Sequence, residues 1–89
     1  MKYKIVFTKK AKGDFLLLQN KIQKQMAEKL RFYITQPDPL QYSKKLKNSR
    51  HGTYRFRIVD YRAIFDLDKD GNIVILLILR IKYRKEVYL

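Results

Sequence analysis

The fold is decided by one stretch of sequence, Tyr54-Arg55-Phe56-Arg57-Ile58-Val59-Asp60-Tyr61-Arg62-Ala63-Ile64-Phe65. In its first five residues, aromatic and β-branched side chains alternate with two arginines. Side chains along a β-strand point alternately to the two faces of a sheet. This pattern therefore predicts a strand with one apolar face and one face of guanidinium groups. Val59-Asp60 suits a turn, so Tyr61 to Leu67 is expected to form a second, antiparallel strand.

A third strand is expected after a tight hairpin. Asp68-Lys69-Asp70-Gly71 suits such a turn, because an Asp-Gly pair supplies the positive φ that two-residue hairpins need. Ile73 to Ile81 is almost continuously apolar, as expected for a central strand that is covered on both faces. The second half of the chain thus predicts a three-stranded antiparallel meander.

Two helices are predicted earlier in the chain. Thr8 can N-cap a helix from Lys9 to Gln19, and Asn20 can cap a second helix that ends near Thr35. Apolar side chains fall at helical spacing on both, namely Ala11, Phe15 and Leu18 on the first and Ile22, Met26, Leu30 and Tyr33 on the second. Gln36-Pro37-Asp38-Pro39 ends the second helix, and the short join between the two helices predicts an antiparallel hairpin.

These elements together predict an α+β fold. Tyr3 to Phe7, which is rich in aromatic and β-branched residues, is expected to form an N-terminal strand. The helix hairpin follows, then Leu40 to Thr53 as a polar, basic loop, then the meander, with the strands forming one sheet. A chain of 89 residues without a repeat or linker is expected to be a single domain spanning residues 1–89.

Charge is the strongest compositional feature. There are 21 lysines and arginines against 8 acidic residues, giving a formal net charge of +13. Self-repulsion of that size opposes compactness, so we expect an anionic partner: nucleic acid, an anionic membrane or an acidic protein. The longest apolar run is too short to span a bilayer, no secretory segment is visible, and the absence of cysteine suits a reducing cytosol, so a cytoplasmic protein that binds no membrane is expected.

Most familiar catalytic sites are unsupported by the sequence. Residues 66–71 resemble the opening of a calcium loop, but Leu77 stands where the bidentate Glu belongs. His51, the one histidine, is either a catalytic or an ordinary surface residue, and without cysteine or a second histidine no transition-metal site is expected. No phosphate loop, nucleophile elbow or dinucleotide motif is present. We expect no metal and no small-molecule cofactor.

What stands out is a set of basic and aromatic residues in the second half of the chain. Arginine forks fit phosphate oxygens and tyrosine rings stack on unpaired bases, so the set favours nucleic-acid binding over a merely solvated strand edge. The set consists of Lys44, Lys45, Lys47, Arg50, Arg55, Arg57, Arg62, Lys82, Arg84 and Lys85, interleaved with Tyr54, Tyr61, Tyr83 and Tyr88.

The order of elements, the stretch from Leu46 to Phe65 and the ending from Ile78 to Tyr88 resemble the RelE/ParE toxin superfamily, on its RelE side. The resemblance covers nearly the whole chain. By position, it implies catalytic roles for Arg57, Arg62, Arg84 and Tyr88. It implies RNA contacts for Lys44, Lys45, Lys47, Arg50, Arg55, Lys82, Tyr83 and Lys85.

The resemblance also implies an activity. RelE-like toxins are metal-independent ribonucleases in which the substrate's own 2′-hydroxyl attacks phosphorus. Arg62, with Arg55 or Arg57, would hold the phosphate. Arg84 would assist the leaving oxygen, and Tyr88 would act as a base or stack on a nucleobase. Many relatives have His-Arg where this chain has Tyr83-Arg84, which leaves the proton-transfer role open, with Lys82 as the alternative to Arg84.

The partners implied are a cognate antitoxin, acidic where it binds, together with the ribosome and messenger RNA. Two other functions remain open. A ParE-like inhibitor of DNA gyrase would share the fold and cleave nothing. A plain RNA- or DNA-binding domain would use the same basic surface without chemistry.

Overall fold

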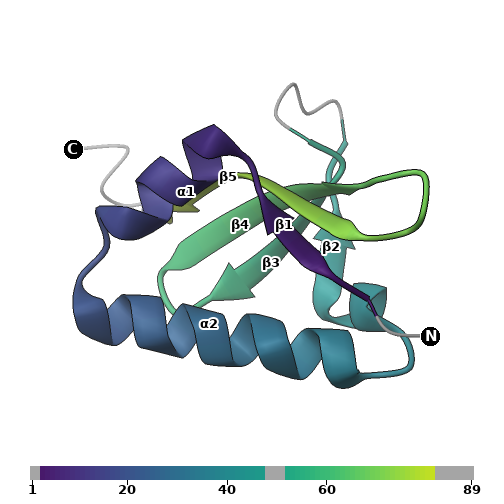
Figure 1. Ribbon diagram of the computed structural model, residues 1–89, viewed down its shortest axis with the longest axis horizontal. Helices are drawn as coiled ribbons and strands as arrows, with labels where there is room; N and C mark the ends of the chain where they lie inside the picture. Colours follow the sequence, from purple (N-terminus) through teal and green to yellow (C-terminus); the bar gives the residue numbers. More distant parts are fainter. Residues whose placement is uncertain (1–2, 48–51, 82–89) are drawn as a thin grey trace.

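The computed structural model describes residues 3–47 and 52–81. Within these ranges the chain forms two α-helices, one 3₁₀ helix and a five-stranded sheet (Figure 1). No helix in this part of the chain has the length and apolarity needed to cross a membrane. The elements follow in the order β1 (Ile5–Phe7), α1 (Lys9–Leu16), α2 (Asn20–Thr35), η1 (Pro39–Tyr42), β2 (Ser43–Lys45), β3 (Tyr54–Ile58), β4 (Tyr61–Leu67) and β5 (Ile73–Arg80).

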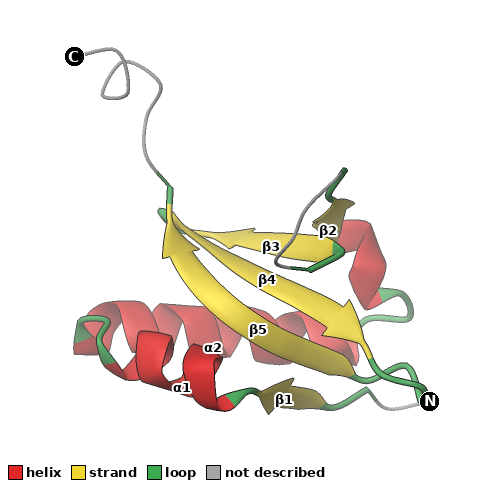
Figure 2. Cartoon of the chain, turned by 90° about the horizontal axis from the view of Figure 1, so that it is seen from above, coloured by secondary structure: helices red, strands yellow, loops and turns green. Residues whose placement is uncertain are grey.

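The sheet has the strand order β1-β5-β4-β3-β2. β3, β4 and β5 form the predicted antiparallel meander, while β1 pairs in parallel with β5 and β2 pairs antiparallel with β3. Figure 2 shows α1 and α2 beneath the sheet, on one face only. The predicted α+β fold is confirmed, and among the described residues no helix covers the other face of the sheet.

The core lies between this sheet and the helices. Tyr33 of α2 stacks on Phe56 of β3 at 4.6 Å between ring centroids, and Phe56 stacks on Phe65 of β4 at 4.4 Å. Both phenylalanines are completely buried. The alternation seen in the sequence therefore acts as predicted: the apolar side chains of β3 point to the helices, and its arginines point to the other face.

The prediction of a loop from Leu40 to Thr53 is wrong in its first part, which forms η1 and β2. Asp38 caps η1 by accepting a hydrogen bond from the amide of Leu40 (3.2 Å), and Pro39 is buried at its start. The chain then pairs with the free edge of β3, with Ser43 opposite Phe56. A three-residue strand that contains two lysines has no apolar alternation, so the sequence did not reveal it.

The two helices also differ from the predictions where they adjoin each other, at the end of α1 and the start of α2. Thr8 caps α1 as expected, since its hydroxyl accepts a hydrogen bond from the amide of Ala11 (3.1 Å). However, α1 ends at Leu16 instead of Gln19, and Asn20 is the first residue of α2 instead of its cap. The side chain of Gln23 stabilises the join by donating to the carbonyl of Leu18 (2.9 Å).

The apolar segment from Ile73 was expected to be covered on both faces and to extend to Ile81, and both expectations are wrong. β5 ends at Arg80, and Leu79 is 43% exposed. The reason is that the helices cover only one face of the sheet (Figure 2). Residues of β5 that point to the other face are apolar without being fully buried.

Both predicted turns are present. Val59 begins the β3–β4 turn with a φ of 56°, and Gly71 in the β4–β5 turn has a φ of 84°. The carboxylate of Asp68 accepts hydrogen bonds from the amides of Asp70 and Asn72, each at 2.9 Å. These bonds, led by that from Asn72, hold the pKa of Asp68 below its usual value. The acidic segment that resembles a calcium loop thus stabilises its own turn.

Candidate nucleic-acid interface

The face of the sheet that the helices leave uncovered, here called the open face, gathers four cations. Register places Lys44 of β2 opposite Arg55 of β3, and Arg57 of β3 opposite Arg62 of β4. All four side chains lie on the side away from Phe56 and the core, because strand residues alternate between faces. We call Lys44, Arg55, Arg57 and Arg62 the basic cluster.

All four members of this cluster carry positive charge. Within the described residues, no carboxylate forms a salt bridge with any of its three arginines; the ion pair between Lys10 and Asp14 lies on α1. Burial, followed by the charges of Arg62 and Arg57, lowers the pKa of Arg55. Like charges directly opposite each other destabilise a sheet. A phosphate group would remove this repulsion, since it accepts hydrogen bonds from several guanidinium forks at once.

The chain enters β3 along a closely packed path that fixes the position of Arg55. The carboxylate of Asp66 accepts a hydrogen bond from the amide of Thr53 (2.6 Å), and the carbonyl of Thr53 accepts one from the amide of Leu46 (2.7 Å). At Gly52, a Cβ atom would lie 2.8 Å from Ile64 Cγ2 and 2.9 Å from Leu76 Cδ1. The residues leading into β3 therefore rest directly on the open face.

The predicted site residues divide into three groups. Lys44, Arg55, Arg57 and Arg62 come together as the basic cluster. Lys45 is opposite Tyr54 and so belongs to the other face, while Lys47 is exposed beyond β2. The remaining candidates lie outside the described residues, namely Arg50, Lys82, Tyr83, Arg84, Lys85, Tyr88 and the alternative His51.

Sequence reasoning did not anticipate the neighbours of these cations. Lys44 was expected to bind RNA from a loop, whereas β2 fixes it beside Arg55. Asp66 and Gly52 had no predicted role. The sequence held only a weak signal for Asp66, which follows Arg62 at an even spacing and therefore lies on the same face of the strand. Gly52 precedes β3 at a point where a larger residue would collide with the sheet.

The described residues offer nothing that could hold a metal, since they contain no group of three or more His, Cys, Asp or Glu side chains close enough together. The chemistry that the basic cluster can perform is electrostatic. Its guanidinium groups can bind a phosphodiester and stabilise added negative charge on it.

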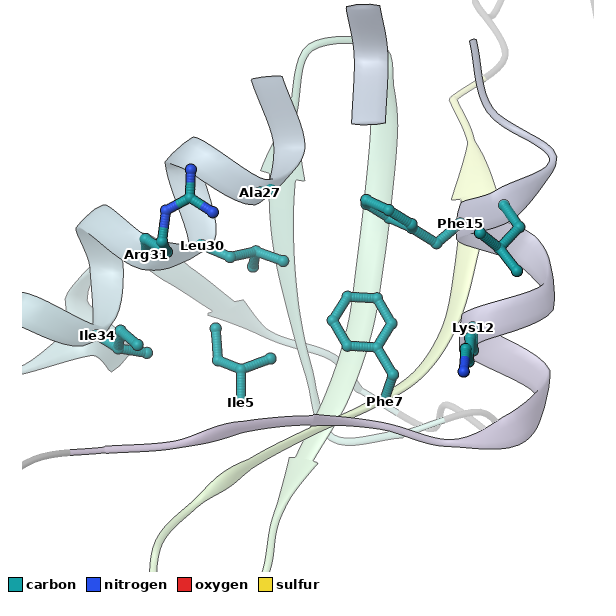
Figure 3. Close-up of a pocket in the computed structure, with 9 residues that line it drawn as sticks. Ile5, Phe7, Lys12, Phe15, Ala27, Leu30, Arg31 and Ile34 are labelled. Carbon is teal, nitrogen blue, oxygen red and sulfur yellow. The ribbon is translucent and has the colours of Figure 1, made fainter. Parts of the chain in front are cut away.

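A second surface lies on the opposite side of the molecule, where α1, α2 and β1 enclose a groove of about 590 Å³. Figure 3 shows Ile5 and Phe7 pointing from β1 between the helices, with Phe15 on α1 and Leu30 and Ile34 on α2. Phe7 and Phe15 meet edge to face at 5.5 Å. Two cations, Lys12 and Arg31, also line this apolar groove.

Residues 5–88 match the family described as the ParE toxin of the type II toxin–antitoxin system parDE. The chain belongs to this toxin family. The match covers all described elements and most of the segment after β5. The resemblance to the RelE/ParE superfamily inferred from the sequence is thereby confirmed, and the chain is a toxin of the type II toxin–antitoxin class.

Two solved structures are similar to this toxin. The toxin–antitoxin complex RelBE2 from Mycobacterium tuberculosis matches with a TM-score of 0.72 and 25% identity, over 90% of this chain and 99% of that one. The archaeal RelE–RelB complex from Pyrococcus horikoshii matches with a TM-score of 0.69 and 25% identity, over 90% and 96% of the two chains. No curated protein sequence is significantly similar to the chain.

Proposed function

We propose that this toxin is a metal-independent endoribonuclease that cleaves messenger RNA on the ribosome. The basic cluster supports the proposal most directly: three arginines and a lysine converge on one face, and no salt bridge joins them to a carboxylate of the described residues. A phosphodiester placed there would meet two guanidinium groups, Arg57 and Arg62, projecting from neighbouring strands. Such preorganised donors stabilise a transition state that carries more negative charge than the substrate.

The proposed reaction is an internal transfer. The ribose 2′-oxygen bonds to the adjacent phosphorus and loses its proton to a base, while the bond from phosphorus to the 5′-oxygen breaks and that oxygen takes up a proton. The products are a 2′,3′-cyclic phosphate and a 5′-hydroxyl. Arg62, with Arg55 or Arg57, holds the phosphorane. By position in the family, Arg84 assists the leaving oxygen and Tyr88 acts as base or stacks, both from the segment beyond the described residues.

The decisive experiment expresses the toxin without an antitoxin and maps messenger RNA ends by primer extension. We expect cuts within codons and an arrest of translation, with DNA supercoiling by gyrase unchanged. Arg62→Ala removes one preorganised donor and should slow cleavage by about 10²–10³-fold while the protein still folds. Tyr88→Phe keeps the ring and isolates the hydroxyl. Intact messages together with trapped gyrase–DNA complexes would instead assign the toxin a ParE-like activity.

The proposal includes a cognate antitoxin, as the two similar structures are complexes with one. We propose that the groove between α1, α2 and β1 receives an amphipathic helix of that antitoxin. Its apolar lining suits the apolar face of such a helix, and Lys12 and Arg31 suit acidic residues beside that face. An acidic segment continuing onto the basic cluster would then neutralise the toxin.

A matched pair of leucines tests this docking surface. Leu16 lines the groove and is 62% exposed, whereas Leu17 is 88% exposed and lies outside the lining. Leu16→Glu should weaken antitoxin binding by at least about tenfold, because it places a charge in an apolar contact facing an acidic partner. Leu17→Glu should change affinity little. Equal effects of the two variants in titration calorimetry would place the antitoxin elsewhere.

A further inference from the structure

The open face is divided into two halves of different chemistry. The basic cluster consists of residues from β2 and β3, together with Arg62 of β4. β5 contributes leucines instead, with Leu77 opposite Ile64 and Leu79 opposite Arg62. The boundary between cations and apolar side chains therefore runs along β4, parallel to the strand.

One row across the strands shows this division most sharply. Arg57, Arg62 and Leu79 are consecutive partners on β3, β4 and β5. Neighbouring strands lie about 4.8 Å apart, which places Leu79 about 5 Å from Arg62 and about 10 Å from Arg57 at the backbone. Arg57 and Arg62 are exposed, and Leu79 keeps 43% of its surface exposed beside them.

The rest of the apolar half is already partly covered by the chain itself. Ile64 is only 4% exposed, and Gly52 lies directly against it and against Leu76. Leu77 is half-buried. Among the described residues of this half, Leu79 is therefore the apolar position that stays exposed next to the arginine pair, and it would gain most from a ligand that covers it.

Single-stranded RNA carries the same division along its length, with phosphates on one edge and bases on the other. We propose that the leucine half of the open face receives the unpaired bases of an RNA strand whose phosphates lie on the basic cluster, and that Leu79 contacts the nucleoside next to the Arg57–Arg62 pair. This inference rests on the proposed ribonuclease function. A duplex keeps its bases stacked inside and would leave Leu79 uncovered.

Two anionic probes separate contacts to bases from contacts to phosphates. Single-stranded poly(U) presents both, whereas linear inorganic polyphosphate presents a chain of phosphates without nucleosides. Leu79→Thr keeps a residue that favours strands and removes most of the apolar surface. It should weaken poly(U) binding by about fivefold, because covering the exposed part of the leucine contributes only a fraction of the free energy of burying a whole leucine. Polyphosphate binding should be unchanged. Arg62→Gln should weaken both.

Two further variants make the result interpretable. Leu67→Thr alters a leucine of similar exposure (37%) at the other end of the same sheet and should change neither affinity. Leu79→Phe offers a ring on which a base can stack and should tighten poly(U) binding about fivefold or more, again without effect on polyphosphate.

The outcomes are distinguishable. Wild-type protein that binds neither probe overturns the ribonuclease proposal and this inference with it. Tight poly(U) binding that Arg62→Gln weakens but Leu79→Thr and Leu79→Phe leave unchanged overturns only the inference. A Leu79→Thr variant with a lower thermal midpoint and unchanged poly(U) affinity would assign Leu79 to packing within the protein, which also overturns the inference.

Discussion

At the scale of single residues, the arginine pair across β3 and β4 reveals a conflict between stability and binding. Arg57 and Arg62 face each other directly, and the pKa of Arg55 is lowered by burial and then by the charges of Arg62 and Arg57. No carboxylate among the described residues forms a salt bridge with them. A sheet selected only for stability would place opposite charges or apolar side chains at such positions. The proposed binding of RNA phosphates would explain why cations occupy these positions instead.

This conflict predicts that removing charge strengthens the fold and weakens function. Arg62→Gln should raise the free energy of unfolding by about 0.2–1 kcal/mol, the range for relieving one like-charge pair across strands. RNA affinity should fall in the same variant. Lys24→Gln, at an exposed position on α2, removes the same charge away from the cluster and should change both quantities less. Chemical denaturation and RNA binding are measured on each variant, and a destabilised Arg62→Gln would contradict the argument.

At the scale of elements, the residues before β3 and the first helix each carry a glycine in a different environment. A Cβ at Gly52 would collide with Ile64 and Leu76, whereas nothing lies within 4 Å of a Cβ at Gly13 in α1. We expect Gly52→Ala to destabilise the protein by about 1–3 kcal/mol through overpacking. Gly13→Ala should stabilise it by about 0.5–1 kcal/mol through helix propensity. Thermal melts with the same sign for both variants would show that the packing at Gly52 is looser than described.

A carboxylate of α1 is hydrogen-bonded to the backbone of β5. β1 pairs with only the first three residues of β5, so the backbone amides farther along this edge of β5 need other acceptors. Asp14 accepts a hydrogen bond from one of them, the amide of Ile78 (2.9 Å). Burial raises the pKa of Asp14, but the bonds from Lys10 and Ile78 outweigh it, so the pKa lies below the ordinary 3.8. The folded state therefore gains stability from the ionised carboxylate above about pH 4, and loses it as the pH falls through the lowered pKa.

Asp14→Ala should accordingly lower the free energy of unfolding at pH 7 by about 1–2 kcal/mol, the value of a hydrogen bond to a charged group at a partly exposed site. The difference from wild type should shrink at pH 3, below the ordinary pKa of 3.8, because the carboxylate of the unfolded chain is then largely protonated. Asp14→Asn keeps an acceptor for Ile78 and should fall between the two. Urea denaturation at both pH values measures this. A difference that does not depend on pH would mean that the charge of Asp14 contributes nothing.

Some elements of the fold could be predicted from the sequence and others could not. The alternation around Arg55 and Arg57 and the turn at Val59-Asp60 were enough to predict two neighbouring strands, whereas the pairing of Arg62 with Arg57 was found only in the structure. β2 was not predicted, because three residues are too few to show an alternation of apolar and polar side chains. The position of Lys44 beside Arg55 was therefore missed. The exposed side of β5 was missed because an apolar segment does not indicate whether a second layer covers it.

At the scale of the whole molecule, a charge of +13 raises the question of whether RNA binding is diffuse or localised. Each phosphate contact on a single strand adds about 0.7 to the slope of log affinity against log salt, so a strand bound by the four cations of the basic cluster should show a slope near 3 in magnitude. If binding is localised, Arg62→Gln lowers the slope by about 0.7 while Lys24→Gln leaves it unchanged. Equal reductions in both variants would mean that the net charge, and not the cluster, holds the RNA. A slope near zero in the wild-type protein would remove the nucleic-acid interface altogether.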